Sequence, residues 1–193
     1  MGHSQVEKAR SRERILTEAA ARIRDGGFES IGVASLMKSV NLTHGGFYGH
    51  FASRSELLAL ALERALADGE ANARAAAGPG RARSFAAIVR SYLSRTHRDA
   101  PKTGCAIASL AADAGRADID ARTVMASHIE TFFATVATAS GSDDDQDAMV
   151  AVSAMVGALM LSRVLPDARR SDALLRAVRD HLIQNQTGST EQG

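Results

Sequence analysis

Residues 28–51, FESIGVASLMKSVNLTHGGFYGHF, decide the fold that this chain is expected to adopt. They contain a short amphipathic segment, a tight connection and a second short segment. In the second segment, hydroxyl, imidazole and phenol groups and two glycines stand where a core helix would carry aliphatic side chains. This order predicts a helix-turn-helix that presents small and polar groups to a nucleic acid.

The segments on either side of the motif are also expected to be helical. Apolar residues recur at helical spacing over residues 5–25. Asn41 stands where the second helix, over residues 33–40, should end on a left-handed residue, and Thr43 is a suitable N-cap for the third helix. Ser53, followed by Glu three positions later, has the capping-box spacing for a helix that reaches residue 77.

The rest of the chain predicts a helical body. The composition is rich in Ala, with 45% hydrophobic residues, three prolines and no tryptophan, which favours packed helices over sheets. The fold class is therefore all-α, with a helix-turn-helix DNA-binding domain over 8–54, a helical regulatory and dimerisation domain over 55–185 and a disordered tail over 186–193. Helices beyond residue 77 are expected at 82–98, 104–116, 119–140, 145–165 and 171–185.

The charge distribution and the cysteine content favour a cytoplasmic protein whose N-terminal part is basic. Residues 1–54 carry eight Lys and Arg against five Asp and Glu, whereas residues 55–193 carry fifteen against seventeen, so the basic excess lies in the helix-turn-helix part. Cys105 is the only cysteine, which excludes an intrachain disulfide. The N-terminus lacks an apolar signal region, and the longest uncharged run, 148–162, is too short for a membrane span. A cytoplasmic protein without membrane contact is expected.

A set of residues between positions 10 and 58 is shared with a known family. The set is Arg14-Ile15-Leu16, Gly27-Phe28, Leu36, Leu42-Thr43-His44-Gly45-Gly46-Phe47-Tyr48-Gly49-His50-Phe51 and Ser53-Arg54-Ser55-Glu56-Leu57. It resembles the DNA-binding region of the TetR/AcrR family of bacterial transcription regulators. Further along the chain, only the length, the helical pattern and the Gly104-Cys105 helix start resemble that family.

The resemblance implies an all-α homodimer whose C-terminal domain binds a small molecule and whose N-terminal domain binds DNA, most often as a repressor. Arg54 stands where the family usually has Lys, close to a phosphate. Gly32 replaces the Ser or Thr that usually caps the second helix, so one phosphate-contacting hydroxyl is missing, and Asn41 replaces the usual turn Gly. The residues that fall on DNA-contacting positions of the family are Thr43, His44, Gly45, Tyr48 and His50.

The chemistry of these residues agrees with a DNA-contacting face. Hydroxyl and imidazole groups donate to phosphates or base edges, and glycines let the backbone approach a groove closely. Phe47 and Phe51 are assigned to the core, and Arg12, Arg14 and Arg22 to a mainly solvated face. The alternative for Tyr48 and His50 is an exposed structural role at a helix corner. The expected DNA-binding residues are Val33, Lys38, Thr43, His44, Gly45, Gly46, Tyr48, His50 and Arg54, of which Lys38 and Arg54 should meet phosphate.

Residues 148–165, AMVAVSAMVGALMLSRVL, are apolar on nearly every side of a helix. Such a helix must be covered all round, so one side is expected to meet its own domain and the other a second copy of the chain. The alternative is a fully internal helix. The residues expected at the dimer interface are Met149, Val152, Met155, Val156, Leu159, Met160, Leu174 and Val178.

A small-molecule effector is expected to bind among the helices at 82–98, 104–116 and 119–140. The alternative for each lining residue is plain core packing, because pockets and cores use the same side chains. Cys105, placed in the first turn of a helix and near Lys102, is either an electrophile or oxidant sensor or a small wall residue. The expected effector-binding residues are Phe85, Ile88, Tyr92, Cys105, Ile107, Met125, His128, Ile129 and Phe132.

The sequence offers no set of residues for catalysis or metal binding. Paired carboxylates, a nucleophile with its base, and zinc-ligand spacing are not apparent, so no cofactor and no metal are expected. The expected partners are a double-stranded DNA operator, an unknown small-molecule effector and a second copy of the chain. The competing hypothesis is a small helical ligand carrier or enzyme without a role at DNA.

Overall fold

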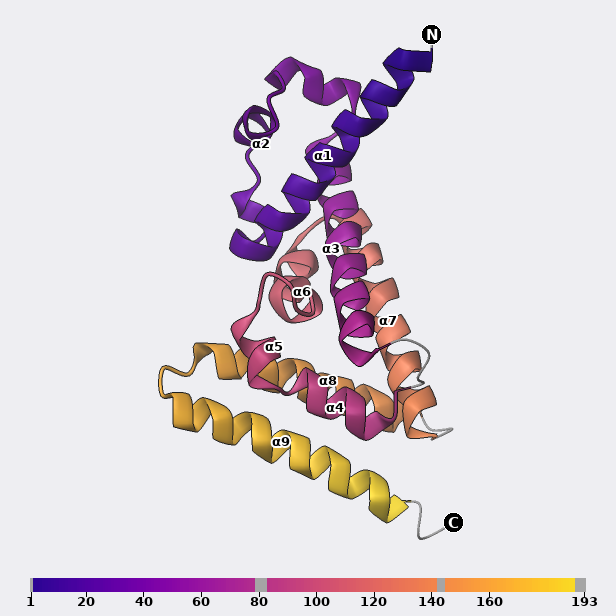
Figure 1. The fold of residues 1–193 in the computed structure, drawn as a ribbon, viewed down its shortest axis with the longest axis vertical. Coiled ribbons are helices and arrows are strands. Elements are labelled where there is room, and N and C mark those ends of the chain that lie inside the picture. Colours follow the sequence, from indigo (N-terminus) through magenta and orange to yellow (C-terminus); the bar gives the residue numbers. More distant parts are fainter. Residues whose placement is uncertain (1, 79–82, 142–144, 190–193) are drawn as a thin grey trace.

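The computed structural model describes residues 2–78, 83–141 and 145–189. These residues form helices and connecting segments without any strand, as the sequence predicts. In Figure 1 a small N-terminal unit lies at the top and a larger helical body below it, and the long helix α3 runs from one into the other. The last helix, α9, lies at the opposite end of the molecule from the N-terminal unit.

The N-terminal unit is the expected helix-turn-helix, and three predicted local signals are confirmed. Asn41 has a φ of 58°, the left-handed conformation expected after the second helix. The Thr43 side chain accepts a hydrogen bond from Gly46 N–H (3.3 Å), and Ser53 accepts one from Glu56 N–H (3.0 Å). The elements are α1 (Gly2–Gly26), η1 (Phe28–Ser30), α2 (Val33–Ser39), η2 (His44–Gly49) and α3 (Arg54–Ala77).

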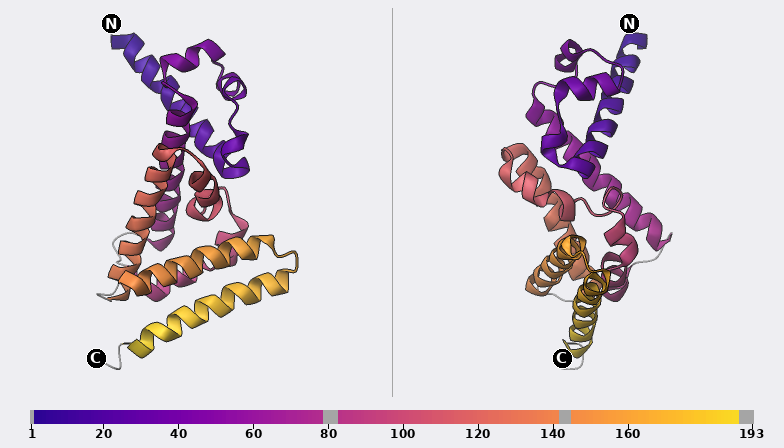
Figure 2. Two further views of the ribbon diagram at one scale, coloured as in Figure 1. Left: turned by 180° about the vertical axis from the view of Figure 1, so that it is seen from behind. Right: turned by 90° about the vertical axis from the view of Figure 1, so that its left-hand side faces the viewer.

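The body consists of helices packed around α3. Helix α7 runs alongside α3, and α8 and α9 lie one below the other across the base of the molecule (Figures 1 and 2). The elements are α4 (Phe85–Tyr92), α5 (Arg95–Asp99), α6 (Ile107–Arg116), α7 (Ile119–Ser140), α8 (Asp145–Val164) and α9 (Ala168–Ser189).

Some elements differ from the sequence-based expectation. The single helix expected over 82–98 is broken into α4 and α5, because Ser94 starts a new helix by accepting a hydrogen bond from His97 N–H (3.1 Å). The third helix of the motif is a 3₁₀ turn, η2, which suits a segment containing several glycines. Helix α9 continues to Ser189, beyond the expected end at 185, and residues 190–193 lie outside the described part.

Two hydrophobic cores hold the fold. The first, here called the N-terminal core, joins buried residues of α1, α2 and α3 to Ile107 and Leu110 of α6 and Met125 of α7. The second joins α4, α7, α8 and α9 around Val89, Met155 and other buried residues. The N-terminal core therefore crosses the expected domain boundary at residue 54, and the body completes the packing of the helix-turn-helix unit.

Among the described residues one helix, α8, is long and apolar enough to cross a membrane by length and composition alone. Its buried residues include Val152, Met155 and Leu159, which pack in the second core. Arg163, near the end of α8, is hydrogen-bonded to α5. Helix α8 is therefore partly buried within the chain's own core.

Candidate nucleic-acid interface

Two buried phenylalanines position the short element η2. Phe47 and Phe51 are 1% and 2% exposed, and their ring centroids lie 5.5 Å apart within the N-terminal core. Their burial supplies the packing that a glycine-rich 3₁₀ turn could not provide for itself. The prediction that both belong to the core is confirmed, and the remaining side of η2 is turned outward.

The outward side of η2 carries the polar residues expected to meet DNA. Thr43, His44 and Gly45 are exposed, and Tyr48 is 69% exposed with its ring edge-on to Phe47 at 5.2 Å. A Cβ added at Gly45 would meet no atom within 4 Å, and its φ is not positive. Nothing within the described chain therefore requires glycine there, whereas the close approach of an outside surface would.

Three other residues expected to contact DNA differ in their exposure to solvent. Lys38 is exposed and makes no ion pair among the described residues. Val33 is half-buried against the N-terminal core, and Gly46 faces α2, where an added Cβ would lie 3.8 Å from Met37 Cε. Both lie on the inner side of the motif, so they support its packing more than they extend its surface.

Arg54 and Arg12 are tied to the protein itself. Arg54 donates to Phe28 O (2.9 Å) and Ile31 O (3.2 Å), which anchors the start of α3 to the connection before α2. Arg12 lies over the Phe51 ring at 4.9 Å and pairs with Glu56 (3.5 Å). Sequence reasoning placed Arg54 on phosphate and Arg12 on a solvated face, and it missed these internal contacts because their partners lie far away in sequence.

A tight junction connects the N-terminal unit to the body. Arg24 of α1 is 8% exposed, and its guanidinium donates to Lys102 O and Gly104 O (both 2.9 Å) and to Ala65 O. Gly69 of α3 allows this approach, since a Cβ there would lie 2.9 Å from Gly104 O. One guanidinium thus joins α1, α3 and the segment before α6.

A second contact joins α6 directly to the end of α1. Phe28 N–H donates to Asp113 Oδ2 (3.2 Å), and Arg116 pairs with the other oxygen of that carboxylate (2.6 Å). Gly27, with a φ of 69°, lies so close that a Cβ would meet Asp113 Oδ2 at 2.4 Å. The N-terminal unit is therefore joined to α6 by the Phe28–Asp113 bond and to the segment before α6 by the Arg24 bonds.

His97 holds the segment before α6 from the other side. Its Nδ1 lies 2.7 Å from Tyr92 O, and its Nε2 lies 2.8 Å from Cys105 N. The amide of Cys105 can only donate, so Nε2 accepts and Nδ1 carries the proton. Burial, with a smaller contribution from Arg163, lowers the pKa of His97, although its bond to Tyr92 O opposes the shift. His97 is therefore neutral.

The residues expected to bind an effector lie within and between the two cores. Phe85, Ile88 and Tyr92 are buried in the second core, and Ile107 and Met125 are buried in the N-terminal core. Half-buried Ile129 packs against the N-terminal core, and the pKa of half-buried His128 is lowered, chiefly by burial. Cys105 and Phe132 touch both cores, and Phe132 stacks on Tyr92 at 5.6 Å.

Tyr92 and Cys105 form the polar part of that region. The Tyr92 hydroxyl is buried and makes no hydrogen bond by geometry within the described chain; burial raises its pKa, with the neighbouring Cys105 contributing. Helix α6 begins at Ile107, so Cys105 precedes the helix rather than lying in its first turn. Lys102 pairs with Asp25 (2.9 Å), which turns its charge toward α1. These two findings weaken the sequence argument for an activated thiol.

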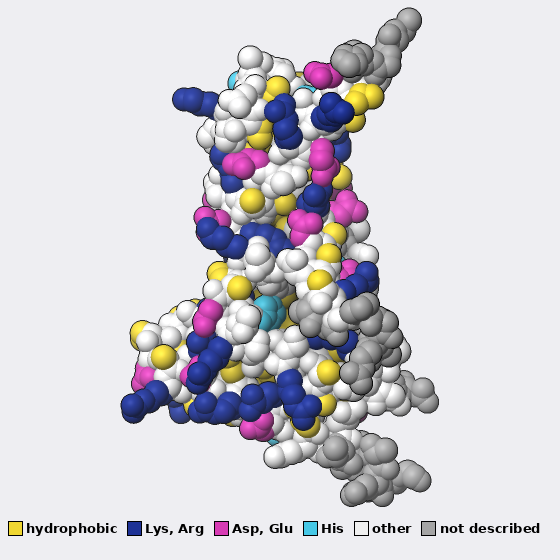
Figure 3. Space-filling view, in the orientation of Figure 1, with side chains coloured by type: hydrophobic (Ala, Val, Ile, Leu, Met, Phe, Trp, Pro, Cys, Tyr) yellow, Lys and Arg dark blue, Asp and Glu magenta, His cyan; other side chains and the backbone are white. Residues whose placement is uncertain are grey.

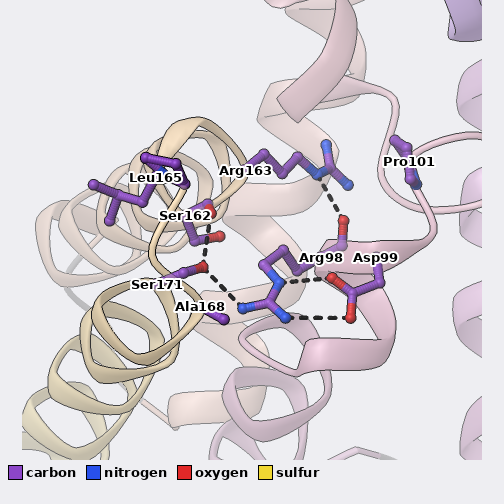
Figure 4. A pocket seen from close by; sticks show the side chains of 9 residues that line it. Arg98, Asp99, Pro101, Ser162, Arg163, Leu165, Ala168 and Ser171 are labelled. Atoms are coloured by element: carbon purple, nitrogen blue, oxygen red, sulfur yellow. Dashed lines mark hydrogen bonds and ion pairs between the residues drawn. The ribbon is translucent and has the colours of Figure 1, made fainter.

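A cavity of about 420 Å³ lies where α5 meets the turn between α8 and α9. In Figure 4 the Arg98 side chain lies between Asp99 and Ser171, and Ser171 in turn reaches Ser162. These polar groups are hydrogen-bonded to one another. None of the expected effector-binding residues lines the cavity. The lining residues are Arg98, Asp99, Pro101, Ser162, Arg163, Leu165, Pro166, Ala168 and Ser171.

The exposed side of α8 differs from the expected dimer set. Val152, Met155 and Leu159 are at most 3% exposed and pack inside the chain's own core, so the structure assigns them to internal packing. Met149 and Met160 are 39% and 38% exposed, while Val156, Leu174 and Val178 are half-buried. The most open apolar side chains of this helix are Val150, Leu161 and Val164, at 65%, 59% and 79%.

Charge is spread over more than one part of the surface. Figure 3 shows Lys and Arg side chains on the N-terminal unit at the top and in a band across the lower body. Within the described ranges, no group of three or more His, Cys, Asp or Glu is placed to hold a metal ion.

The same arrangement occurs in solved structures. A TetR-family regulator from Cytophaga hutchinsonii matches with a TM-score of 0.78 at 18% identity, covering 92% of this chain and 96% of its own. A TetR regulator from Chloroflexus aurantiacus matches with a TM-score of 0.75 at 22% identity, over 94% and 96%. The reduced form of Escherichia coli NemR matches with a TM-score of 0.68 at 21% identity, over 89% and 94%.

No protein-family model matches the sequence, and no curated protein matches it. The likeness at these identities is one of fold, and it extends over about nine-tenths of the chain. The chain therefore has the fold of the TetR-family transcriptional regulators.

Proposed function

We propose that this protein is a cytoplasmic, homodimeric transcriptional repressor that binds a DNA operator through η2 and releases it when a small molecule binds the body. The observation that carries the proposal is the outward face of η2, where Thr43, His44 and Tyr48 are exposed around an unobstructed Gly45. Polar groups of this kind contact phosphates and base edges in the major groove, and an exposed tyrosine ring can lie against a sugar or a thymine methyl.

The exposed apolar side of α8 supports the dimer. Val150, Leu161 and Val164 offer aliphatic surface to water, which a second copy of the same helix would cover across a twofold axis. Two copies would also present two η2 elements to one duplex. Reading two half-sites about one DNA turn apart, roughly 34 Å, requires such a pair.

The junction around Arg24 supports control by a small molecule. Tyr92, Cys105 and Phe132 lie between the two cores, and the buried Tyr92 hydroxyl is available to hydrogen-bond a ligand. A ligand there would displace the segment 100–106, whose carbonyls Arg24 holds from α1. The two sites would then be coupled by about 1–3 kcal/mol, which is enough to lower operator affinity many-fold.

The test measures binding to labelled duplex DNA from the region flanking the protein's own gene, with a shuffled duplex as competitor and the salt concentration stated. We expect the wild type to prefer the native duplex and Tyr48→Ala to weaken it about tenfold, because an exposed base or sugar contact is lost. Ile119→Ala, which removes an equally exposed side chain from α7, serves as the matched control. A Tyr48→Ala protein that binds like the control would contradict the proposal.

A further inference from the structure

A second cavity lies between the N-terminal part of α1 and the end of η2. Its volume is about 300 Å³, and it is lined by Glu7, Lys8, Ser11, Gly49 and His50. The N-terminal end of α1 and the η2 region lie at the same end of the molecule in every view (Figures 1 and 2). Because Gly49 and His50 line it, the cavity adjoins the same element that carries Tyr48.

The His50 ring presents one nitrogen as a donor to this cavity. Its Nδ1 is buried and has no hydrogen-bond partner in the described chain, so Nε2 is the nitrogen left for an outside group. A charged ring would place an N–H without an acceptor at Nδ1, which is costly. Burial, Lys8 and Arg12 all lower the pKa of His50. The ring is neutral, with its proton on Nε2.

The other polar groups of the cavity are mostly donors as well. Lys8 is exposed and forms no ion pair with any described residue. The Ser11 hydroxyl accepts from Arg14 (3.4 Å), which leaves its own proton to donate. Gly49 adds no side chain, and a Cβ there would meet nothing within 4 Å. Glu7 is the single acidic group on the wall, so its carboxylate opposes an anion.

Two arginines close to η2 are already engaged within the protein. Arg12 pairs with Glu56, donates to His50 O (3.4 Å) and covers the Phe51 ring, while Arg54 holds two backbone carbonyls. Lys8 lines the cavity, and its charge is not paired with any acidic group of the described residues. An ammonium, a hydroxyl and an imidazole N–H that meet at one cavity suit the oxygens of a phosphate.

We propose that this cavity seats one backbone phosphate of the DNA duplex, with Lys8 Nζ, Ser11 Oγ and His50 Nε2 as its donors. The site rests on the proposed DNA-binding function and extends it from η2 to α1. It fixes the register of the protein on the duplex and reads no base, because phosphate contacts carry no sequence information. Its contribution is consequently the same for native and shuffled duplexes and declines as salt rises.

The charge test compares three variants that each change one charge, over a series of salt concentrations and with both duplexes. We expect Lys8→Gln to weaken binding several-fold on both duplexes and to reduce the slope of log K against log[salt] by about 1. Glu7→Gln should tighten binding, because it removes the opposing carboxylate. Arg122→Gln, on the exposed side of α7, makes the same charge change as Lys8→Gln and should leave the slope unaltered.

The geometry test exchanges the histidine for amides of two lengths. Gln at position 50 can place its NH₂ near Nε2 and should bind within about threefold of wild type, whereas His50→Asn is too short and should bind about tenfold more weakly. Wild type that binds neither duplex refutes the proposed function. The phosphate site alone is refuted if the wild type binds DNA but two pairs of variants do not differ in affinity. These pairs are Lys8→Gln and Arg122→Gln, and His50→Asn and His50→Gln. Circular dichroism spectra confirm that each variant is folded.

Discussion

At the scale of single residues, His97 is the side chain whose protonation the structure most clearly decides. One ring nitrogen faces a carbonyl and the other faces an amide N–H, so each must play a different role. Protonation of His97 Nε2 would place its N–H opposite the Cys105 amide N–H, so that two donors would face each other. The added charge would also lie close to the Arg163 guanidinium. Gly104 packs so closely that a Cβ would meet the ring at 2.6 Å, which leaves the imidazole little room to turn away.

This arrangement makes the stability of the protein depend on pH. Because burial holds the pKa of folded His97 below its ordinary value near 6.5, the unfolded chain binds more protons than the folded one in acid. The stabilisation from neutral His97 is therefore complete above pH 6.5 and is lost as the pH falls through the folded pKa. We expect the free energy of unfolding, measured by urea titration, to fall from pH 7.5 to pH 5.5.

His97→Gln separates this effect from the other histidines, since the pKa values of His50 and His128 are also lowered. At pH 7.5 the variant should be about 1–3 kcal/mol less stable than wild type, because at least one buried hydrogen bond is lost. The gap between the two proteins should narrow as the pH falls below 6.5. A gap that stays constant with pH would contradict a neutral His97.

At the scale of elements, the junction of α1, α3 and the segment before α6 depends on one small residue. Gly69 is buried in the middle of α3, and a Cβ there would lie 2.9 Å from Gly104 O and 3.1 Å from an Arg24 nitrogen. We expect Gly69→Ala to destabilise the protein by about 1–3 kcal/mol despite the higher helix propensity of alanine, because backbone or guanidinium must shift.

Gly115→Ala in α6 is the matched control, as a Cβ there meets nothing within 4 Å. It should be neutral or stabilise by about 0.5–1 kcal/mol, the usual gain when alanine replaces glycine in a helix. Thermal unfolding of both variants checks the pair. Equal effects of the two substitutions would show that the junction at Gly69 is loose.

The elements also show what sequence could and could not predict. Asn41, Thr43 and Ser53 act on neighbours within a few residues, so the ends of the helices around the motif were readable from local chemistry. The break between α4 and α5 was missed although its cap, Ser94, is a local signal; the His97 ring that supports the break also reaches across to Cys105. A glycine in the middle of the long, alanine-rich α3 was the available signal for a close approach at position 69.

The surface residues likewise divide into those whose placement follows from nearby sequence and those whose placement depends on distant parts of the chain. The outward position of Tyr48 and His44 follows from the spacing of Phe47 and Phe51, which the sequence contains. The engagement of Arg54 depends on the carbonyls of Phe28 and Ile31, whose direction only the folded backbone provides. Lys8 and Ser11 were missed for the same reason, as they reach the end of η2 only after α1 has packed.

At the scale of the whole molecule, the open side of α8 predicts the state of association. Leu161 is 59% exposed, and Glu at that position would place a charge in an interface between two copies. We expect the wild type to be dimeric by light scattering, Leu161→Glu to be mainly monomeric, and the affinity of the variant for a two-half-site duplex to fall more than tenfold. Ile119→Glu, on equally exposed surface of α7, should stay dimeric. A dimeric Leu161→Glu would place the interface elsewhere.

The N-terminal core has a further consequence for how such a protein can change. Most of its buried side chains come from α1 to α3, and the remainder come from the α6–α7 region, so the N-terminal unit has no complete core of its own. A hybrid protein joined at residue 54 to the body of another protein would combine two parts of a hydrophobic core that do not match in shape. Substitutions of individual surface residues leave this shared core intact, whereas exchange of the whole N-terminal unit does not.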